Sequence, residues 1–307
     1  MNPPRKRREA VNGWVILDKP YGMTSTQAVG KVRFLFNAEK AGHGGTLDPL
    51  ASGLLPIALG EATKTVSHAM DGRKVYRFTA AWGEERTTDD LEGEVTVTSD
   101  HRPSKDEIEA VLSRFTGEIQ QAPPAFSAIK VAGERAYDLA RAGEAVELAA
   151  RPVLIEALSL VDMPDPDHAT FEVACGKGTY IRSLARDMGR ALGSAAHVSS
   201  LRRVAVGPFT EAHMISLENL AELGHKAPGG DANKGVLLPI ETVLDGIPAL
   251  AIDEEQARRL KLGQTVLLRG ANAPIAEDSV LVMSGGKPLG IGTVIQGSLK
   301  PKRLFNL

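Results

Sequence analysis

A single carboxylate, Asp48, stands within the segment GHGGTLDPLASG that runs from Gly42 to Gly53. Glycines let the backbone adopt positive φ angles or approach a ligand closely, while Pro49 disfavours a helical conformation at Asp48. The pattern therefore predicts a shaped loop that presents one carboxylate, a group that can act as a nucleophile in covalent catalysis. The alternative interpretation is an ordinary Asp-Pro turn.

This segment, extended to GHGGTLDPLASGLLPIALGEATK, is one of four ordered blocks in the chain. The other three are VILDKPYGMTS (Val15 to Ser25), VYRFTAAWG (Val75 to Gly83) and CGKGTYIRSLARDMG (Cys175 to Gly189). Together with PPAFSAIKVAGERAYDLARAG (Pro123 to Gly143), they closely resemble the TruB family, the tRNA pseudouridine synthases that modify a T-loop uridine at tRNA position 55.

The resemblance implies an isomerase whose partner is tRNA, bound through its T-stem loop. Pseudouridine formation breaks the bond between N1 and C1′ of a uridine, turns the uracil and rejoins it through C5. This conversion needs no redox partner and no phosphate donor, so no cofactor is expected. The alternative is an RNA-binding folding factor for tRNA in which catalysis is secondary. The joint presence of Asp48 and Arg182 favours the enzyme.

The resemblance also assigns roles to residues at matching positions. Asp48 is expected to be the catalytic residue, and Arg182 of the YIR motif to pair with it through two parallel hydrogen bonds. Tyr76 is expected to stack on the target base, although a strand tyrosine is more often a core residue. Leu201 is expected to contact the flipped base. His43, otherwise a turn histidine, is expected to occupy space that the flipped nucleotide leaves.

Four further residues are expected to bind substrate or support the site. Tyr180 belongs to the same YIR motif as Arg182, and Lys19 and Pro20 belong to the first block, which the resemblance places beside the Asp48 loop. Asp90 is a rival carboxylate that we expect to order a loop. Five other acidic residues lie between positions 84 and 94, and their charge would hinder the approach of an RNA backbone.

Composition restricts the class of protein further. A chain of 307 residues with 43% hydrophobic content fits two domains or one large one. No apolar run approaches the roughly 18 residues that span a bilayer, and no signal-peptide pattern follows the basic start; we expect no membrane partner, a cytoplasmic location and a monomer. The only cysteine, Cys175, is expected to be a buried apolar residue, and seven scattered histidines predict no metal site.

Charge is unevenly distributed along a chain whose net charge is −2. Ten acidic and three basic residues lie between positions 84 and 109. Basic residues cluster elsewhere, at Arg5 to Arg8, Lys74 and Arg77, Lys130, Arg135 and Arg141, Arg182, Arg186 and Arg190, Arg202 and Arg203, and Lys300, Lys302 and Arg303. A charged run is commonly a solvated face, but several clusters near one candidate site predict an RNA-binding face.

Periodicity predicts a mixed α/β (α+β) fold, and the resemblance specifies a pseudouridine synthase-like mixed sheet flanked by helices. The main predicted elements are strands near 13–20, 75–82 and 170–175 and helices over 25–37, 104–115 and 179–192, the first capped by Ser25. The GKGT at Gly176 lacks the spacing of a P-loop, and residues 224–235 read as a flexible loop.

Two domains are expected. Residues 1–247 form the catalytic domain, in which 1–12 are disordered and 121–151 form a thumb-like RNA-binding insertion. Beyond residue 248, short strands with glycine-rich turns predict a small β-barrel. By resemblance, residues 248–307 are a PUA-like RNA-binding domain, and a packing or oligomerisation module is the alternative.

Overall fold

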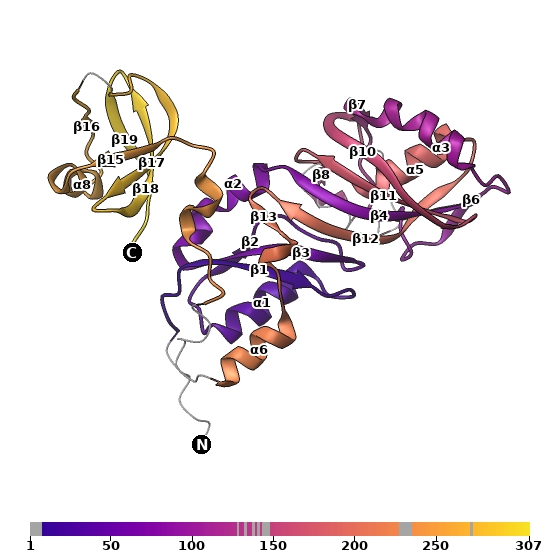
Figure 1. Ribbon diagram of the computed structural model, residues 1–307, viewed down its shortest axis with the longest axis horizontal. Coiled ribbons are helices and arrows are strands. Elements are labelled where there is room, and N and C mark those ends of the chain that lie inside the picture. The colour runs from indigo at the N-terminus through magenta and orange to yellow at the C-terminus, as the bar shows by residue number, and fades with distance from the viewer. Residues whose placement is uncertain are drawn as a thin grey trace.

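The computed structural model describes residues 8–127, 129–131, 134–136, 139, 142, 148–226, 235–270 and 273–307. A large mixed sheet with its helices is followed by a smaller, curled C-terminal sheet, as Figure 1 shows. Part of the expected thumb-like insertion 121–151, most of the loop 224–235 and the N-terminal residues 1–7 lie outside the described residues.

The large sheet has the strand order β14-β1-β3-β12-β4-β11-β10-β7, with β2 added to β3 and β13 to β12. Its strands are β1 (Gly13–Lys19), β2 (Ala41–His43), β3 (Ala51–Leu59), β4 (Lys74–Trp82), β7 (Gly117–Gln121), β10 (Arg151–Asp165), β11 (His168–Cys175), β12 (Ala196–Val206), β13 (Phe209–Thr210) and β14 (Ile215–Ser216). The pairs β1·β14 and β3·β12 are parallel and the others antiparallel. The expected mixed sheet is therefore confirmed.

Helices and short two-stranded ribbons complete this part of the chain. They are α1 (Ser25–Leu35), the 3₁₀ helix η1 (Gly60–Thr65), α2 (Val66–Asp71), β5 (Glu84–Arg86) with β6 (Val95–Thr98), α3 (Lys105–Leu112), η2 (Ser113–Phe115), β8 (Lys130–Val131) with β9 (Glu134–Arg135), α5 (Ile181–Ala191), η3 (Glu211–His213), α6 (Leu217–Lys226) and η4 (Ile240–Leu244). One hydrophobic core lies where β1 and β3 meet α1, and another lies where β4 and β11 meet α5. Strand β12 pairs with both β3 and β4 and joins the two halves.

The N-terminal cap of α3 agrees with the sequence prediction, whereas that of α1 does not. Ser104 and Glu107 form the expected capping box of α3. The expectation that Ser25 caps α1 is wrong, because Thr24 is the cap and Gln27 closes its box. The hydroxyl of Ser25 is buried and bonds to another segment.

The strand and helix faces agree with the periodicity of the sequence. Phe78, Ala80 and Trp82 of β4 are all buried in one core, and Tyr76 packs against it. Cys175 is also buried, as expected, and burial raises the pKa of its thiol to about 11. The thiol is therefore protonated at neutral pH and behaves as an apolar group.

The C-terminal domain is a five-stranded sheet of order β15-β17-β18-β19-β16, in agreement with the small β-barrel expected there. Its elements are β15 (Ala249–Ile252), α8 (Glu254–Lys261), β16 (Val266–Leu267), β17 (Glu277–Ser284), β18 (Lys287–Ile295) and β19 (Ser298–Leu304). Ile291 and Phe305 pack into a core shared with Trp14 of β1. Lys64 of η1 also donates to Leu304 O at 2.7 Å. The domain is thus joined to the large sheet by a core and by hydrogen bonds.

Residues 9–12, which precede β1, form hydrogen bonds with the large-sheet part of the chain. Glu9 N donates to Asn37 O at 2.8 Å, and the side chain of Asn12 accepts from Glu61 N at 2.8 Å. The expectation of a disordered segment is therefore wrong for residues 9–12. In the described parts of the chain, no helix is long and apolar enough to cross a membrane.

Candidate active site

The loop between β2 and β3, which carries the candidate carboxylate, is bonded along its length to the turn between β1 and α1. The hydroxyl of Ser25 donates to Leu47 O and accepts from Leu47 N, both at 2.9 Å. Pro49 O accepts from Gly22 N at 2.8 Å and from Lys19 Nζ at 3.4 Å. These bonds fix the loop from both sides of residue 48.

Lys19 at the end of β1 is fully buried and is therefore not an ordinary surface lysine. Its Nζ donates to Met23 O at 2.6 Å and to Pro20 O at 3.0 Å. Burial lowers the pKa of Lys19 to about 8, although the charge of Asp48 acts in the opposite direction. Pro20 lies at the exposed start of the same turn. The first block therefore packs beside the Asp48 loop.

Arg182 lies at the second position of α5 and reaches Asp48, with 2.9 Å between Nε and Oδ2. The Arg182 side chain is 7% exposed and that of Asp48 is 39% exposed, so the carboxylate faces outward from a buried cation. Nη1 of Arg182 donates to Thr88 O at 2.8 Å and Nη2 to Phe126 O at 3.1 Å. The expected fork of two parallel bonds to Asp48 is wrong, because both terminal nitrogens are directed to backbone carbonyl groups.

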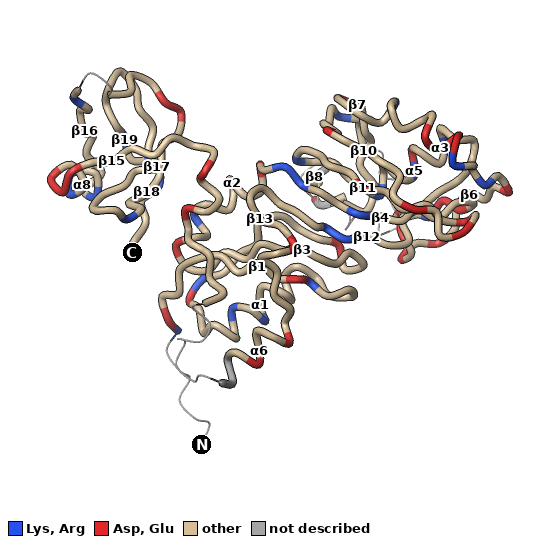
Figure 2. The backbone as a smooth tube through the Cα atoms, viewed as in Figure 1, with Lys and Arg blue, Asp and Glu red and all other residues tan. Residues whose placement is uncertain are grey.

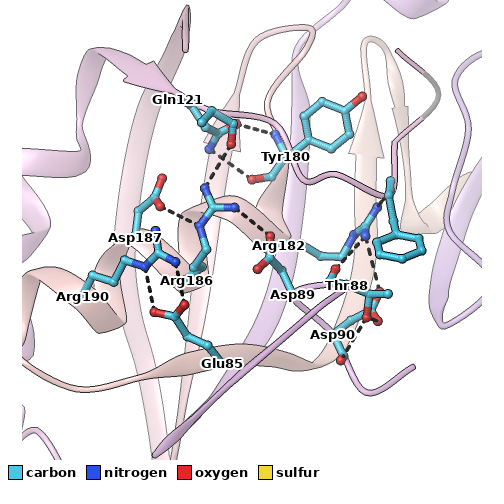
Figure 3. Close-up of polar contacts among 12 residues, drawn as sticks. Glu85, Thr88, Asp89, Asp90, Gln121, Tyr180, Arg182, Arg186, Asp187 and Arg190 are labelled. Atoms are coloured by element: carbon cyan, nitrogen blue, oxygen red, sulfur yellow. Dashed lines mark hydrogen bonds and ion pairs between the residues drawn. The ribbon is translucent and has the colours of Figure 1, made fainter. Parts of the chain in front are cut away.

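Asp90 approaches the same arginine from the loop between β5 and β6, as Figure 3 shows. Its Oδ2 lies 3.7 Å from Nη1 of Arg182, and its Oδ1 accepts from Thr88 Oγ1 and from Glu92 N. The carboxylate therefore orders its own loop and adds negative charge near Arg182. Its side chain is 9% exposed, much less than that of Asp48.

A small pocket opens beside Asp48, between β12 and the loop after β5. It is lined by Asp48, Leu50, Ala51, Asp90, Leu91, Arg182, Val198, Ser199, Ser200 and Leu201. The structure thus brings Leu201 to the same pocket as Asp48 and Arg182. The other lining residues of β12 and Leu91 were not identified from the sequence, because the pairing that brings them together is not local.

Tyr76 of β4 packs against both cores of the large sheet and lies next to Arg203 in the neighbouring strand. Burial raises the pKa of its phenol, so the side chain is neutral at physiological pH. An uncharged aromatic ring at this junction of the sheet can present a face to a base and pack against the core with its other side.

His43 and Tyr180 occupy different environments. His43 lies in β2, and its Nδ1 is buried with no hydrogen-bond partner among the described residues. Burial, then the charge of Arg203, lowers the pKa of His43, which keeps the imidazole neutral. Tyr180 caps α5 and bonds through its backbone to the side chain of Gln121, while Arg151 lies 5.5 Å from its ring centroid. These contacts place Tyr180 beside Gln121 and Arg151, the two ends of the segment 121–151.

The other arginines of α5 form ion pairs within the protein, as Figure 3 shows. Arg186 Nη1 lies 2.8 Å from Asp89 Oδ2, and Arg190 binds both oxygens of Glu85, at 2.7 and 2.6 Å. Burial raises the pKa of Asp89 to about 6, although Arg186 opposes the shift. The acidic segment after β4 therefore pairs with both arginines. The expectation that they belong to an RNA-binding face stays a prediction.

Arg202 is also paired within the protein. It binds both oxygens of Asp18, at 2.9 and 3.0 Å, and Glu211. In Figure 2, acidic residues gather around β6, while basic residues follow β4 and β12. The exposed basic residues of the C-terminal domain, Lys300, Lys302 and Arg303 on β19, remain available to a polyanion.

Three family patterns match the chain in order. Residues 33–181 match the N-terminal domain of TruB family pseudouridylate synthases, and residues 182–245 match the C-terminal domain of tRNA pseudouridylate synthase B. Residues 248–305 match a pattern described as pseudouridine synthase II TruB, C-terminal.

Whole-chain comparisons agree. The chain is 60% identical over 307 residues to the tRNA pseudouridine synthase B of Bradyrhizobium diazoefficiens (strain JCM 10833 / BCRC 13528 / IAM 13628 / NBRC 14792 / USDA 110), covering 100% of this chain and 89% of the relative. A solved Cbf5–Nop10–Gar1 complex contains a chain with a TM-score of 0.74 and 28% identity, covering 95% of this chain and 84% of that one. An H/ACA RNP bound to a substrate RNA containing 2'-deoxyuridine has the same TM-score at 25% identity, covering 96% and 85%.

The fold is that of a pseudouridine synthase, an isomerase that rearranges the glycosidic bond of uridine. Identity over the full length is more specific than the fold. The chain belongs to the TruB family of these enzymes.

Proposed function

We propose that this chain converts one T-loop uridine of tRNA, at position 55, to pseudouridine with Asp48 as the catalytic carboxylate. The observation that carries the proposal is the partly exposed Asp48 at a pocket, in contact with the buried cation of Arg182. The relatives are named for tRNA, which supports the same substrate here. No observation of the described structure favours the folding-factor alternative.

The reaction balances without a cofactor. The glycosidic carbon C1′ leaves N1 and bonds to C5, C5 loses its hydrogen as a proton, and N1 gains a proton. Arg182 holds the carboxylate of Asp48 in place through the 2.9 Å contact between Nε and Oδ2. The exposed oxygen of Asp48 can then act on the sugar or the base, while the pocket holds a uracil that has left its stack.

Uridine mapping tests the proposed substrate. A tRNA transcript incubated with the purified protein is expected to gain one pseudouridine, located at the T-loop site by chemical labelling and reverse transcription. A transcript in which that uridine is replaced by cytidine is the control and should gain none. Modification elsewhere in the tRNA, or none in the T loop, would overturn the substrate assignment.

Tyr76→Leu is expected to lose most activity while it retains much of the affinity for tRNA. Phosphate contacts supply most of the binding energy, whereas the ring places one base, and stacking contributes about 1–3 kcal/mol per base. The measurement is the single-turnover rate beside the Kd of the same transcript. If Tyr76→Leu reacts at the same rate as the parent protein, Tyr76 has only a structural role in the core.

The C-terminal domain, residues 248–307, is proposed to bind the backbone of the tRNA. Lys64 of η1 donates to Leu304 O at the end of β19 at 2.7 Å, so this end of the strand lies beside the large-sheet part of the chain. An RNA bound at Asp48 could continue along this strand.

Replacing Lys300 and Lys302 together by alanine is expected to weaken tRNA binding several-fold. The slope of log Kd against log salt should fall by about 1 for each lost phosphate contact. The rate at saturating RNA should not change. The control replaces Arg258 and Lys261 on α8, which removes the same charge from the same domain. Equal affinity and slope for parent and β19 variant would contradict the proposed surface.

A further inference from the structure

One row across the large sheet contains two candidate site residues, Lys19 and Tyr76, with Gly53 and Arg203 between them. Lys19 of β1 pairs with Gly53 of β3, and Gly53 pairs with Arg203 of β12. On its other side, Arg203 pairs with Tyr76 of β4. Arg203 therefore lies in the row between Lys19 and Tyr76, and neighbouring strands in the row are about 4.8 Å apart. Gly53 has a φ of +95°, and a Cβ there would lie 2.3 Å from Arg203 O. A side chain at this point would separate β3 from β12.

The side chain of Arg203 reaches the loop that precedes β3. Although the residue is only 1% exposed, its guanidinium donates to three backbone carbonyl groups. Nε donates to Leu54 O at 2.8 Å, Nη2 to Gly45 O at 3.0 Å and Nη1 to Thr46 O at 3.4 Å. All three carbonyls belong to the loop and strand on either side of Asp48. Arg203 therefore connects the middle of the sheet to the candidate carboxylate's own loop.

The charge of Arg203 is not matched by an acidic partner. Among the described residues, no carboxylate forms an ion pair with it. A buried cation without a counter-ion is costly, even where carbonyl dipoles bind it. Its field reaches other groups, since Arg203 adds to the effect of burial in lowering the pKa of His43 and of Lys19. Hydrogen bonds to three carbonyl groups do not by themselves require a buried positive charge, so a purely structural role does not explain it.

We propose that Arg203 is a positioning residue of the isomerisation, which holds the Asp48 loop against Tyr76. Arg203 binds carbonyl groups before Asp48, and Lys19 binds the carbonyl of Pro49 directly after it. Arg182 binds the carboxylate itself. Without Arg203 the loop loses its bonds at Gly45 and Thr46, and a misplacement of about 1 Å can slow a reaction roughly 100-fold. The inference rests on the proposed role of Asp48.

Arg203→Met is expected to slow pseudouridine formation roughly 100-fold at saturating tRNA and to leave the tRNA Kd within about threefold, because the buried side chain cannot reach a phosphate. The rate is measured with enzyme in excess, from release of tritium at C5 of labelled uridine. Arg203→Lys, which keeps the charge and can bind fewer carbonyl groups, should give an intermediate rate.

Arg202→Met is the matched control, because the neighbouring arginine points to the other side of β12 and pairs with Asp18 and Glu211. Its rate should stay within about threefold of the parent. A parental rate for Arg203→Met, or equal losses of rate and affinity, would overturn the proposal. If Arg203→Met does not fold, Arg203→Lys becomes the test. A rate of Arg203→Lys equal to the parent's would then overturn the proposal.

Parent and Asp48→Asn are measured in the same assay. Release by the parent, none by Asp48→Asn and normal release by the Arg203 variants would reject this inference alone. No release by the parent, or normal release by Asp48→Asn, would reject the proposed function itself.

Discussion

Arg182→Met is expected to fold, to bind tRNA with nearly parental affinity and to form pseudouridine roughly a thousandfold more slowly. Removing one preorganised electrostatic contact from an active site typically costs about 100- to 1000-fold in rate, and Arg182 is the cation in direct contact with Asp48. Its loss also removes one donor from both Thr88 O and Phe126 O, so the loops beside the pocket lose a shared donor. The measurement is a single-turnover time course beside a binding curve.

Arg190→Met is the matched control for Arg182→Met. It makes the same substitution two turns further along α5, at a side chain that is 58% exposed and pairs with Glu85. Its rate should remain close to the parent's. If both variants lose rate equally, or if Arg182→Met loses its folded circular dichroism spectrum, the arginine is a structural element of α5 rather than part of the reaction.

The sequence predicted much of the fold because the relevant signals are local. The alternation at Tyr76 to Trp82 and the Ser104 capping box depend on neighbouring residues, and both appear in the structure. The four blocks also predicted that Arg182 pairs with Asp48, and the structure shows this contact.

Contacts between distant residues were not predictable in this way. Arg186 and Asp89 are 97 positions apart, so their ion pair depends on how α5 docks on the acidic loop. From the sequence alone, three arginines at spacing four predicted an RNA-binding face and not this ion pair. Ser25 has the sequence signature of a helix cap, yet the loop at Leu47 binds its hydroxyl.

The sequence contained one indication that Arg203 belongs to the site. Leu201 and Arg203 alternate along β12 and share one face, so a base contact at the first predicts a site position for the second. The adjacent Arg202 masked this pattern, because a pair of arginines usually indicates a solvated surface.

Asp48→Asn is expected to have the largest effect of any substitution. It preserves the side-chain volume and the bond from Ala51 N to the backbone carbonyl of residue 48, at 3.1 Å, so the loop should fold. An aspartate used only for a turn tolerates asparagine well, because both side chains make the same local bonds. A reacting carboxylate does not, since the amide carries no charge and is a poor nucleophile. Enzymes commonly accelerate their reactions by about a millionfold or more, and we expect most of this acceleration to disappear.

The decisive measurement is pseudouridine formation by purified Asp48→Asn in one enzyme-excess reaction with a T-loop transcript. Mass spectrometry excludes deamidation back to aspartate, and Asp71→Asn, the same change at a surface residue paired with Lys177, is the control. We expect parental folding and tRNA affinity, normal product with the control, and no detectable pseudouridine with Asp48→Asn. Appreciable product from Asp48→Asn would contradict the assignment of Asp48 and direct the next test to Asp90.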